Sequence, residues 1–169
     1  ITPMKCLVFK INWDYKFTRR SRVMNKKAGY LLLTVVYLIA VGMNLMVSIK
    51  YPDSVIGVEH LMMSIFFILS MLVICFFGST RFSKFLLAGV FSGIFISLVQ
   101  NYFDFIYEIW ILDVISNLQY PLYVLFFIPL FGLNYLLDYS LAMFSLVISI
   151  IFIMLYIVLK INMTKKVQI

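Results

Sequence analysis

The chain has 169 residues, of which 64% are hydrophobic and 12% are charged, with a net charge of +7 and a mean hydropathy of +1.05. About a quarter of the residues in an ordinary soluble domain are charged, so this composition excludes a soluble domain and predicts an all-α integral membrane protein. The positive charge does not indicate a nucleic acid partner, since eight of the fourteen cations precede the first apolar run, where anionic lipid and the positive-inside rule favour them. The expected partner is the lipid bilayer.

Residues 1–27 form the predicted basic leader, which we place in the cytoplasm. Met24-Asn-Lys-Lys is typical of the start of a membrane protein, so we interpret residues 1–23 as an upstream translation or a trimmed fragment. Arg19-Arg20 offers a twin-arginine signal as an alternative, although its spacing to the apolar run is loose.

Four apolar runs are each long enough to cross a hydrocarbon core of about 30 Å, which takes about 20 helical residues. They predict a single multi-pass membrane domain at residues 28–160, followed by a basic cytoplasmic tail at residues 161–169. The predicted spans cover residues 28–49, 58–77, 85–103 and 139–159.

One side of the first predicted span carries polar residues at helical spacing. Residues three or four positions apart share a face of a helix, and lipid does not favour exposed hydroxyls and amides. We therefore expect a stripe that faces other helices, made of Thr34, Tyr37, Val41, Asn44 and Ser48. Within it, Tyr37 and Asn44 are the candidate polar contacts.

The second predicted span begins with Glu59 and His60 near the outer interface. Adjacent glutamate and histidine side chains can bind a metal or move a proton. Because the chain has one histidine and no metal motif, we interpret the pair as solvated at the interface, and we expect no metal or cofactor. His60 shares a helical face with Ser64, Met71 and Cys75, and Ser64 is the candidate polar contact on this helix.

Residues 78–84 are predicted to form a tight turn, which would make the second and third spans antiparallel neighbours. Arg81 and Lys84 in this turn favour the cytoplasmic side. In the third span, small residues at every fourth position let another helix approach closely in lipid; they are Gly89, Gly93 and Ser97. We expect this face to pack inside the chain, and a contact with a second copy or a membrane-protein partner is the alternative.

Residues 104–113 are predicted to form an amphipathic helix on the outer surface. On a helix, Asp104 and Glu108 share a face, whereas Asp113 points away from them. We expect these acids to lie in water, beside an aromatic belt that includes Trp110. A cation site or an acid and base pair at Asp104 and Glu108 is the alternative.

The segment at residues 121–137 is long enough to span, but Pro129 and Gly132 interrupt it near the middle. Placing the basic N-terminus and the basic tail on the cytoplasmic side requires an even number of spans. We therefore predict a bundle of four transmembrane helices with this segment as a re-entrant or interfacial hairpin, and five spans are the alternative. Non-helical backbone at membrane depth must then be covered by protein or water.

The last predicted span also presents a small and polar face, made of Ala142, Ser145, Ser149 and Tyr156. Each of the four spans thus has one side unlike lipid. We expect these sides together to line the interior of the bundle.

The motifs of known chemistry are absent from the sequence: no predicted span has a charged residue in its middle third, and there is no Walker loop, HExxH motif or nucleophile elbow. We therefore expect no catalytic residue, and a non-catalytic accessory, regulatory or immunity-type role through helix packing. A small oligomeric channel or facilitator is the first alternative, with a path lined by Pro129, Gly132 and Asn134. A membrane enzyme at the outer interface is the second, using Glu59, His60, Asp104 and Glu108.

Overall fold

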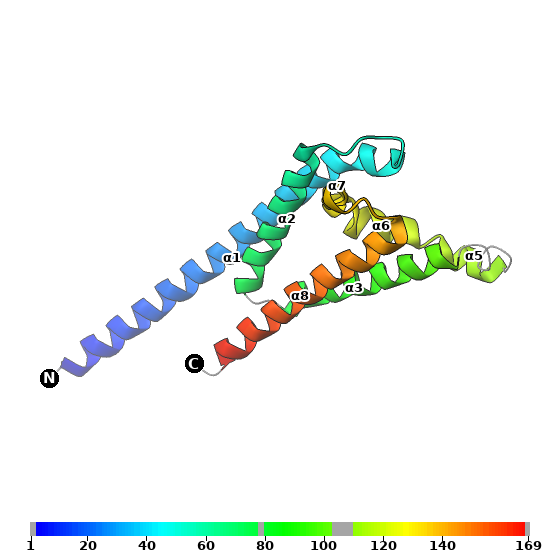
Figure 1. Cartoon of the computed structure of the whole chain (residues 1–169). Helices are drawn as coiled ribbons and strands as arrows, with labels where there is room; N and C mark the ends of the chain where they lie inside the picture. Colours follow the sequence, from blue (N-terminus) through cyan, green and yellow to red (C-terminus); the bar gives the residue numbers. More distant parts are fainter. Residues whose placement is uncertain (1–2, 78–79, 103–109, 168–169) are drawn as a thin grey trace.

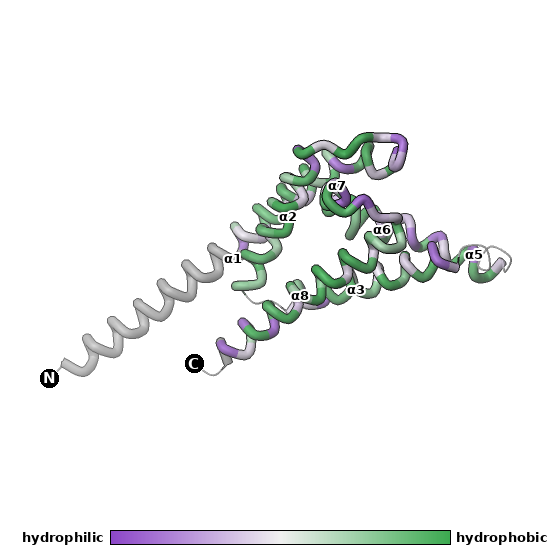
Figure 2. Tube along the Cα trace, viewed as in Figure 1, coloured by the Kyte–Doolittle hydropathy of each residue, from purple (hydrophilic) through white to green (hydrophobic). Residues whose placement is uncertain are grey.

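The computed structural model describes residues 3–77, 80–102 and 110–167, which are mostly helical and contain no β-strand. Among these residues, four helices are each long and apolar enough to cross a membrane. They are α1 (Pro3–Lys50, from Lys27 onward), α2 (Val58–Phe77), α3 (Thr80–Asn101) and α8 (Leu141–Val167). Figure 2 shows that their middles are apolar and that polar residues gather near their ends.

The four long helices form two pairs, with α1 packed on α2 and α3 packed on α8. In Figure 1 the two pairs lie close together at the end of α2 and the start of α3 and diverge from there like a V, with α1 and α2 as its first arm and α3 and α8 as its second arm. Near the narrow end, α2 also contacts α8, and the Cys75 thiol lies 3.5 Å from the carbonyl oxygen of Leu155. Both ends of the chain lie on the same side of the molecule (Figure 1).

The wide end of the V is filled by the predicted broken segment. It comprises α6 (Gln119–Phe126), the 3-10 helix η1 (Ile128–Leu133) and α7 (Asn134–Leu137), and it follows α5 (Trp110–Ser116). The helix axis turns by 67° between Phe126 and Ile128. η1 packs against both α1 and α2, and α6 packs against α3, so the segment joins the two arms.

Pro129 explains why the segment bends after α6, and Gly132 explains why η1 packs closely on α2. Pro129 stands in the first turn of η1, where its missing N–H and fixed φ are tolerated, but it cannot continue α6. A Cβ atom added to Gly132 would overlap the carbonyl oxygen of His60, so only glycine lets the backbone of η1 lie directly on α2.

The hydrophobic core is aromatic where the broken segment meets the second arm. Phe126 and Phe131 of the segment pack edge to face on Phe152 and Phe144 of α8, with ring centroids 5.9 Å and 5.5 Å apart. All four side chains are buried. Such pairs are favourable beyond their buried area, so the segment is an integral part of the fold.

The connection between α2 and α3 differs from the prediction. α3 begins at Thr80, so Arg81 and Lys84 belong to the helix rather than to a tight turn. In the described part of the chain, α2 and α3 make almost no contact and are not antiparallel neighbours. The reason is that α8, which comes last in the sequence, covers the glycine face of α3.

Other predicted boundaries also shift. α1 is one continuous helix from Pro3, so most of the predicted leader continues the first span, and α8 runs on to Val167 through most of the predicted tail. Helical hydrogen bonds join residues four positions apart and need no apolar surroundings, so a helix can extend beyond the apolar segment of the sequence. Thr34 leaves the predicted stripe: it is exposed, and its hydroxyl donates to the Tyr30 carbonyl at 2.9 Å.

Candidate functional site

Two polar side chains from the first arm converge on the carbonyl oxygen of Pro129. The Asn44 Nδ2 donates to this oxygen at 3.2 Å, and the Ser64 hydroxyl donates to it at 3.1 Å. The Asn44 Nδ2 also lies 3.2 Å from the Ser64 oxygen, and both side chains are fully buried. An unpaired carbonyl at this depth would be costly, so these donors stabilise the bend.

A third polar residue of the first arm, Tyr37, replaces the hydrogen bond that Pro129 cannot donate to α6. In an unbroken helix, the carbonyl of Leu125 would accept the N–H of residue 129, but proline has no N–H. The Tyr37 hydroxyl donates to the Leu125 carbonyl at 3.3 Å instead. Tyr37, Asn44 and Ser64 therefore act together as the seat of the broken segment.

His60 belongs to the same network. Because the Asn44 amide nitrogen faces Pro129, its oxygen faces the His60 Nδ1 at 3.1 Å, and this nitrogen must carry the proton. The side chain of His60 is 14% exposed and that of Glu59 is 64% exposed, with 3.7 Å between His60 Nε2 and Glu59 Oε1. The Glu59 side chain is thus exposed, whereas the His60 ring is half-buried and bonded to Asn44, so only Glu59 is as open to solvent as the prediction has it.

A second set of bonds closes the turn between α7 and α8. Asp138 has a φ of 45°, and Asn134 clamps the turn by donating from Nδ2 to the Tyr139 carbonyl at 3.1 Å and accepting from its N–H at 3.0 Å. The Tyr51 hydroxyl donates to Asp138 Oδ1 at 2.7 Å, and this bond, with burial and the charge of Asp138, raises the pKa of Tyr51. The Asn134 amide is therefore committed to the backbone rather than directed at a substrate.

The small residues of α3 meet the small face of α8. Added Cβ atoms would strike the Phe152 ring at Gly89, and the Ser149 hydroxyl and the Ser145 carbonyl at Gly93. The Ser149 hydroxyl donates to carbonyls on both helices, Ser145 at 3.0 Å and Val90 at 3.3 Å. Ser97 is buried further along the same helix. The structure therefore covers this face within the chain.

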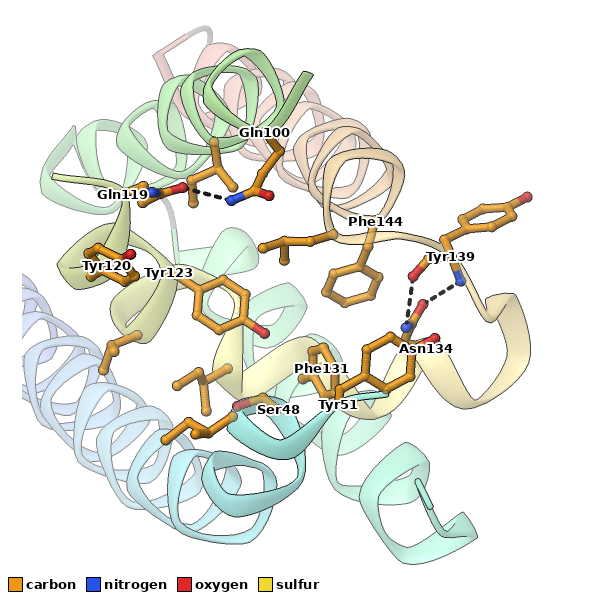
Figure 3. Close-up of a pocket in the computed structure, with 15 residues that line it drawn as sticks. Ser48, Tyr51, Gln100, Gln119, Tyr120, Tyr123, Phe131, Asn134, Tyr139 and Phe144 are labelled. Atoms are coloured by element: carbon orange, nitrogen blue, oxygen red, sulfur yellow. Dashed lines mark hydrogen bonds between the residues drawn. The ribbon is translucent and has the colours of Figure 1, made fainter. Parts of the chain in front are cut away.

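A cavity of about 420 Å³ lies at the wide end of the V, between the end of α1, the end of α3, the broken segment and the start of α8. Figure 3 shows the Tyr123 hydroxyl pointing into it, with Gln100 and Gln119 on one wall and Phe131 and Phe144 on another. The Gln100 Nε2 donates to Gln119 Oε1 at 2.9 Å and ties α3 to α6.

The sequence did not point to Gln100, Gln119, Tyr123 or the pairing of Tyr51 with Asp138. Two glutamines at the borders of apolar segments were the available signal, because amides there must find partners or water. Asp104 and Glu108 lie outside the described residues. Among the described residues, no group of three or more histidine, cysteine, aspartate or glutamate side chains is placed to hold a metal ion.

Comparisons with models of known protein families, with curated proteins and with solved structures find no match for this chain. The polar seat, the cavity and the exposed surfaces are therefore the features of the molecule from which a function can be inferred.

Proposed function

We propose that the chain is a four-span protein of the cell membrane with both termini in the cytoplasm, and that residues 121–137 form a re-entrant hairpin on the outer side. Gly89 opposite Phe152 and Gly93 opposite Ser149 make α3 and α8 antiparallel, so the chain between them leaves and returns at one end of the pair. The basic residues near both termini favour the cytoplasm.

In this proposal the role is non-catalytic: an accessory, regulatory or immunity-type protein that acts by helix packing. The observation that carries it is the state of Asn44, His60 and Ser64, which are bonded to one another and, through Asn44 and Ser64, to Pro129. Side chains that satisfy a broken backbone are engaged in holding the fold, which favours a scaffold over a catalyst.

The surface offered to a membrane-protein partner or a second copy is the outward face of α1. The glycine face of α3 is covered by α8, so contacts in trans must use apolar side chains that the chain leaves uncovered. On α1 these include Leu31, Leu38, Val35 and Met46. In lipid, such contacts depend on close packing rather than on the hydrophobic effect.

Purification from native membranes in a mild detergent tests this role, with mass and composition measured together. We expect a stoichiometric protein partner or a defined oligomer that is lost on Leu38→Trp. Met154→Trp, which enlarges an exposed residue of α8 instead, is the matched control and should leave the complex intact. A monomer without a partner, from membranes in which the protein is functional, would contradict the proposal.

A second candidate function is that of a facilitator, which the cavity lined by the broken segment favours. Flux of small neutral solutes into proteoliposomes tests it. We expect Gln119→Leu to alter that flux, whereas Asn101→Leu, at an exposed amide, should not. Liposomes no more permeable than protein-free ones would exclude this candidate.

A further inference from the structure

The lining of the cavity at the wide end changes from polar to apolar with depth. Tyr51 follows the last residue of α1 and Gln100 precedes the last residue of α3, and both line the cavity. Ile96 lies about one turn before Gln100, some 6 Å deeper along α3, and Phe144 lies about one turn beyond the first residue of α8. A molecule in the cavity would therefore meet polar groups at one end and hydrocarbon at the other.

The polar groups of the lining are all uncharged: hydroxyls and amides, with no aspartate, glutamate, lysine, arginine or histidine among the residues that line it. A charged head group would be taken out of water here without an opposite charge to pair with, which is unfavourable. The tyrosine hydroxyl and glutamine amides can donate to carbonyl or hydroxyl oxygens. The chemistry of the lining thus selects an uncharged head.

The structure fixes these groups in place. Gln119 is buried and is bonded to Gln100 on the neighbouring helix. The Tyr123 ring stacks on Phe127 with centroids 6.1 Å apart and meets Phe131 edge on at 6.5 Å, which aims its hydroxyl into the cavity (Figure 3). Groups that are already ordered lose little entropy when a ligand binds.

We propose that this cavity binds an uncharged amphipathic lipid, with its hydroxyl or carbonyl head near Gln119 and Tyr123 and its hydrocarbon chain against Ile96, Ile128 and Phe144. At about 30 Å³ for each water-sized group, 420 Å³ holds about 14 groups, the size of a compact head with a short length of acyl or isoprenoid chain. The site goes beyond the proposed accessory role and stands whether or not a protein partner is found.

Binding to the purified full chain tests the proposal, using hexadecanol and hexadecanoate at pH 9 as probes with the same chain and different head charge. Native mass spectrometry and thermal unfolding in a mild detergent are the measurements. We expect a one-to-one adduct and a raised Tm with hexadecanol, and at least tenfold weaker binding of hexadecanoate. A monoacylglycerol and a decyl-substituted benzoquinone, tested alongside, distinguish an acylglycerol source from an isoprenoid quinone source.

Substitutions inside and outside the cavity test whether hexadecanol binds there. Val124→Phe enlarges a side chain that lines the cavity and should weaken hexadecanol binding at least tenfold. Val73→Phe is the matched control, because Val73 and Val124 are 46% and 44% exposed and only Val124 lines the cavity. Tyr123→Phe keeps the ring and removes one hydrogen-bond donor, so we expect about fivefold weaker binding.

The proposal is overturned if hexadecanoate binds as tightly as hexadecanol, or if Val73→Phe weakens binding as much as Val124→Phe. It is also overturned if Tyr123→Phe binds like the wild type, and this variant decides the matter if Val124→Phe fails to fold. Circular dichroism and the Tm of the ligand-free proteins show which variants fold.

Discussion

Asn44 shows how much one polar residue can decide in an apolar bundle. Its amide nitrogen donates to the Pro129 carbonyl and to the Ser64 oxygen, and its oxygen accepts from the His60 Nδ1. One side chain therefore links α1, α2 and η1. Asn134 works by the same chemistry on a smaller scale, because both ends of its amide bind the backbone of Tyr139. Each amide replaces hydrogen bonds that an irregular backbone cannot make by itself.

Asn44→Ala should therefore lower the free energy of unfolding by about 1–3 kcal/mol, since it removes one of the two donors to the buried Pro129 carbonyl and leaves the His60 Nδ1 without its acceptor. Denaturant titration in mixed micelles measures the change. Asn101→Ala, at an exposed amide near the end of α3, is the control and should change stability by less than about 0.5 kcal/mol. Equal effects of the two substitutions would contradict the inclusion of Asn44 in the seat of the broken segment.

The hydrogen bond of the Tyr51 hydroxyl should make the stability of the fold fall at alkaline pH. Its pKa is raised above 10.0, chiefly by the bond to Asp138, so the folded state holds this proton more tightly than the unfolded chain does. The resulting stability is present below pH 10 and is lost as the pH rises through the folded pKa. We expect the Tm advantage of the wild type over Tyr51→Phe to shrink between pH 9 and pH 12.

Tyr51→Phe keeps the edge contact of the ring with Phe131, whose centroid lies 5.6 Å away, so the comparison isolates the hydroxyl. Tyr135→Phe, at an exposed ring, serves as the control. A Tm difference between wild type and Tyr51→Phe that stays constant across this pH range would contradict the assignment.

At the scale of elements, the fold is two helix pairs held apart at one end by a broken helix. The α3 and α8 pair relies on small residues that bring two backbones together, as expected where lipid gives no hydrophobic drive for association. The α1 and α2 helices pack directly on each other, and η1 packs against both, where Gly132 allows the close approach to His60.

A pair of glycine substitutions separates packing from helix propensity. Gly93→Ala places a methyl group against the Ser149 hydroxyl and the Ser145 carbonyl, and should cost about 1–3 kcal/mol through overpacking. Gly42→Ala meets nothing within 4 Å and should be neutral or stabilising by up to about 1 kcal/mol, because alanine is the better helix former. Unfolding in mixed micelles measures both, and a Gly93→Ala variant as stable as Gly42→Ala would refute the close contact.

At the scale of the whole molecule, the V leaves both termini on one side and the loop between α1 and α2 on the other (Figure 1). Charge follows this division, since the basic residues of the leader and tail lie with the termini. In the proposed topology, the positive-inside rule places the side with the termini in the cytoplasm.

Cysteine labelling tests this topology. In a Cys6→Ser background, where Cys75 is fully buried, we expect a membrane-impermeant maleimide added to intact cells to label Asp53→Cys and not Thr164→Cys. Both positions are exposed, so permeabilised cells should give labelling of both. Labelling of Thr164→Cys in intact cells would contradict the orientation with cytoplasmic termini.

The amino-acid pattern alone determined the features that depend on neighbours in the chain. Apolar runs of membrane length predicted the four long helices, and Pro129 with Gly132 predicted the break, because backbone hydrogen bonding and helical periodicity act over a few residues. The polar stripe with Tyr37, Asn44 and Ser48 was likewise visible from spacing. Thr34 shows the limit of that argument, since a hydroxyl can satisfy itself on its own helix.

Only the tertiary structure decided what these features face. The sequence could not show that Tyr37, Asn44 and Ser64 meet two carbonyls 65 to 88 residues away, that α3 pairs with α8 rather than α2, or that Tyr51 reaches Asp138. The cavity likewise has walls from four distant parts of the chain. Periodicity fixes which side of a helix is unlike lipid, whereas the partner of that side depends on the shapes of all the helices packed together.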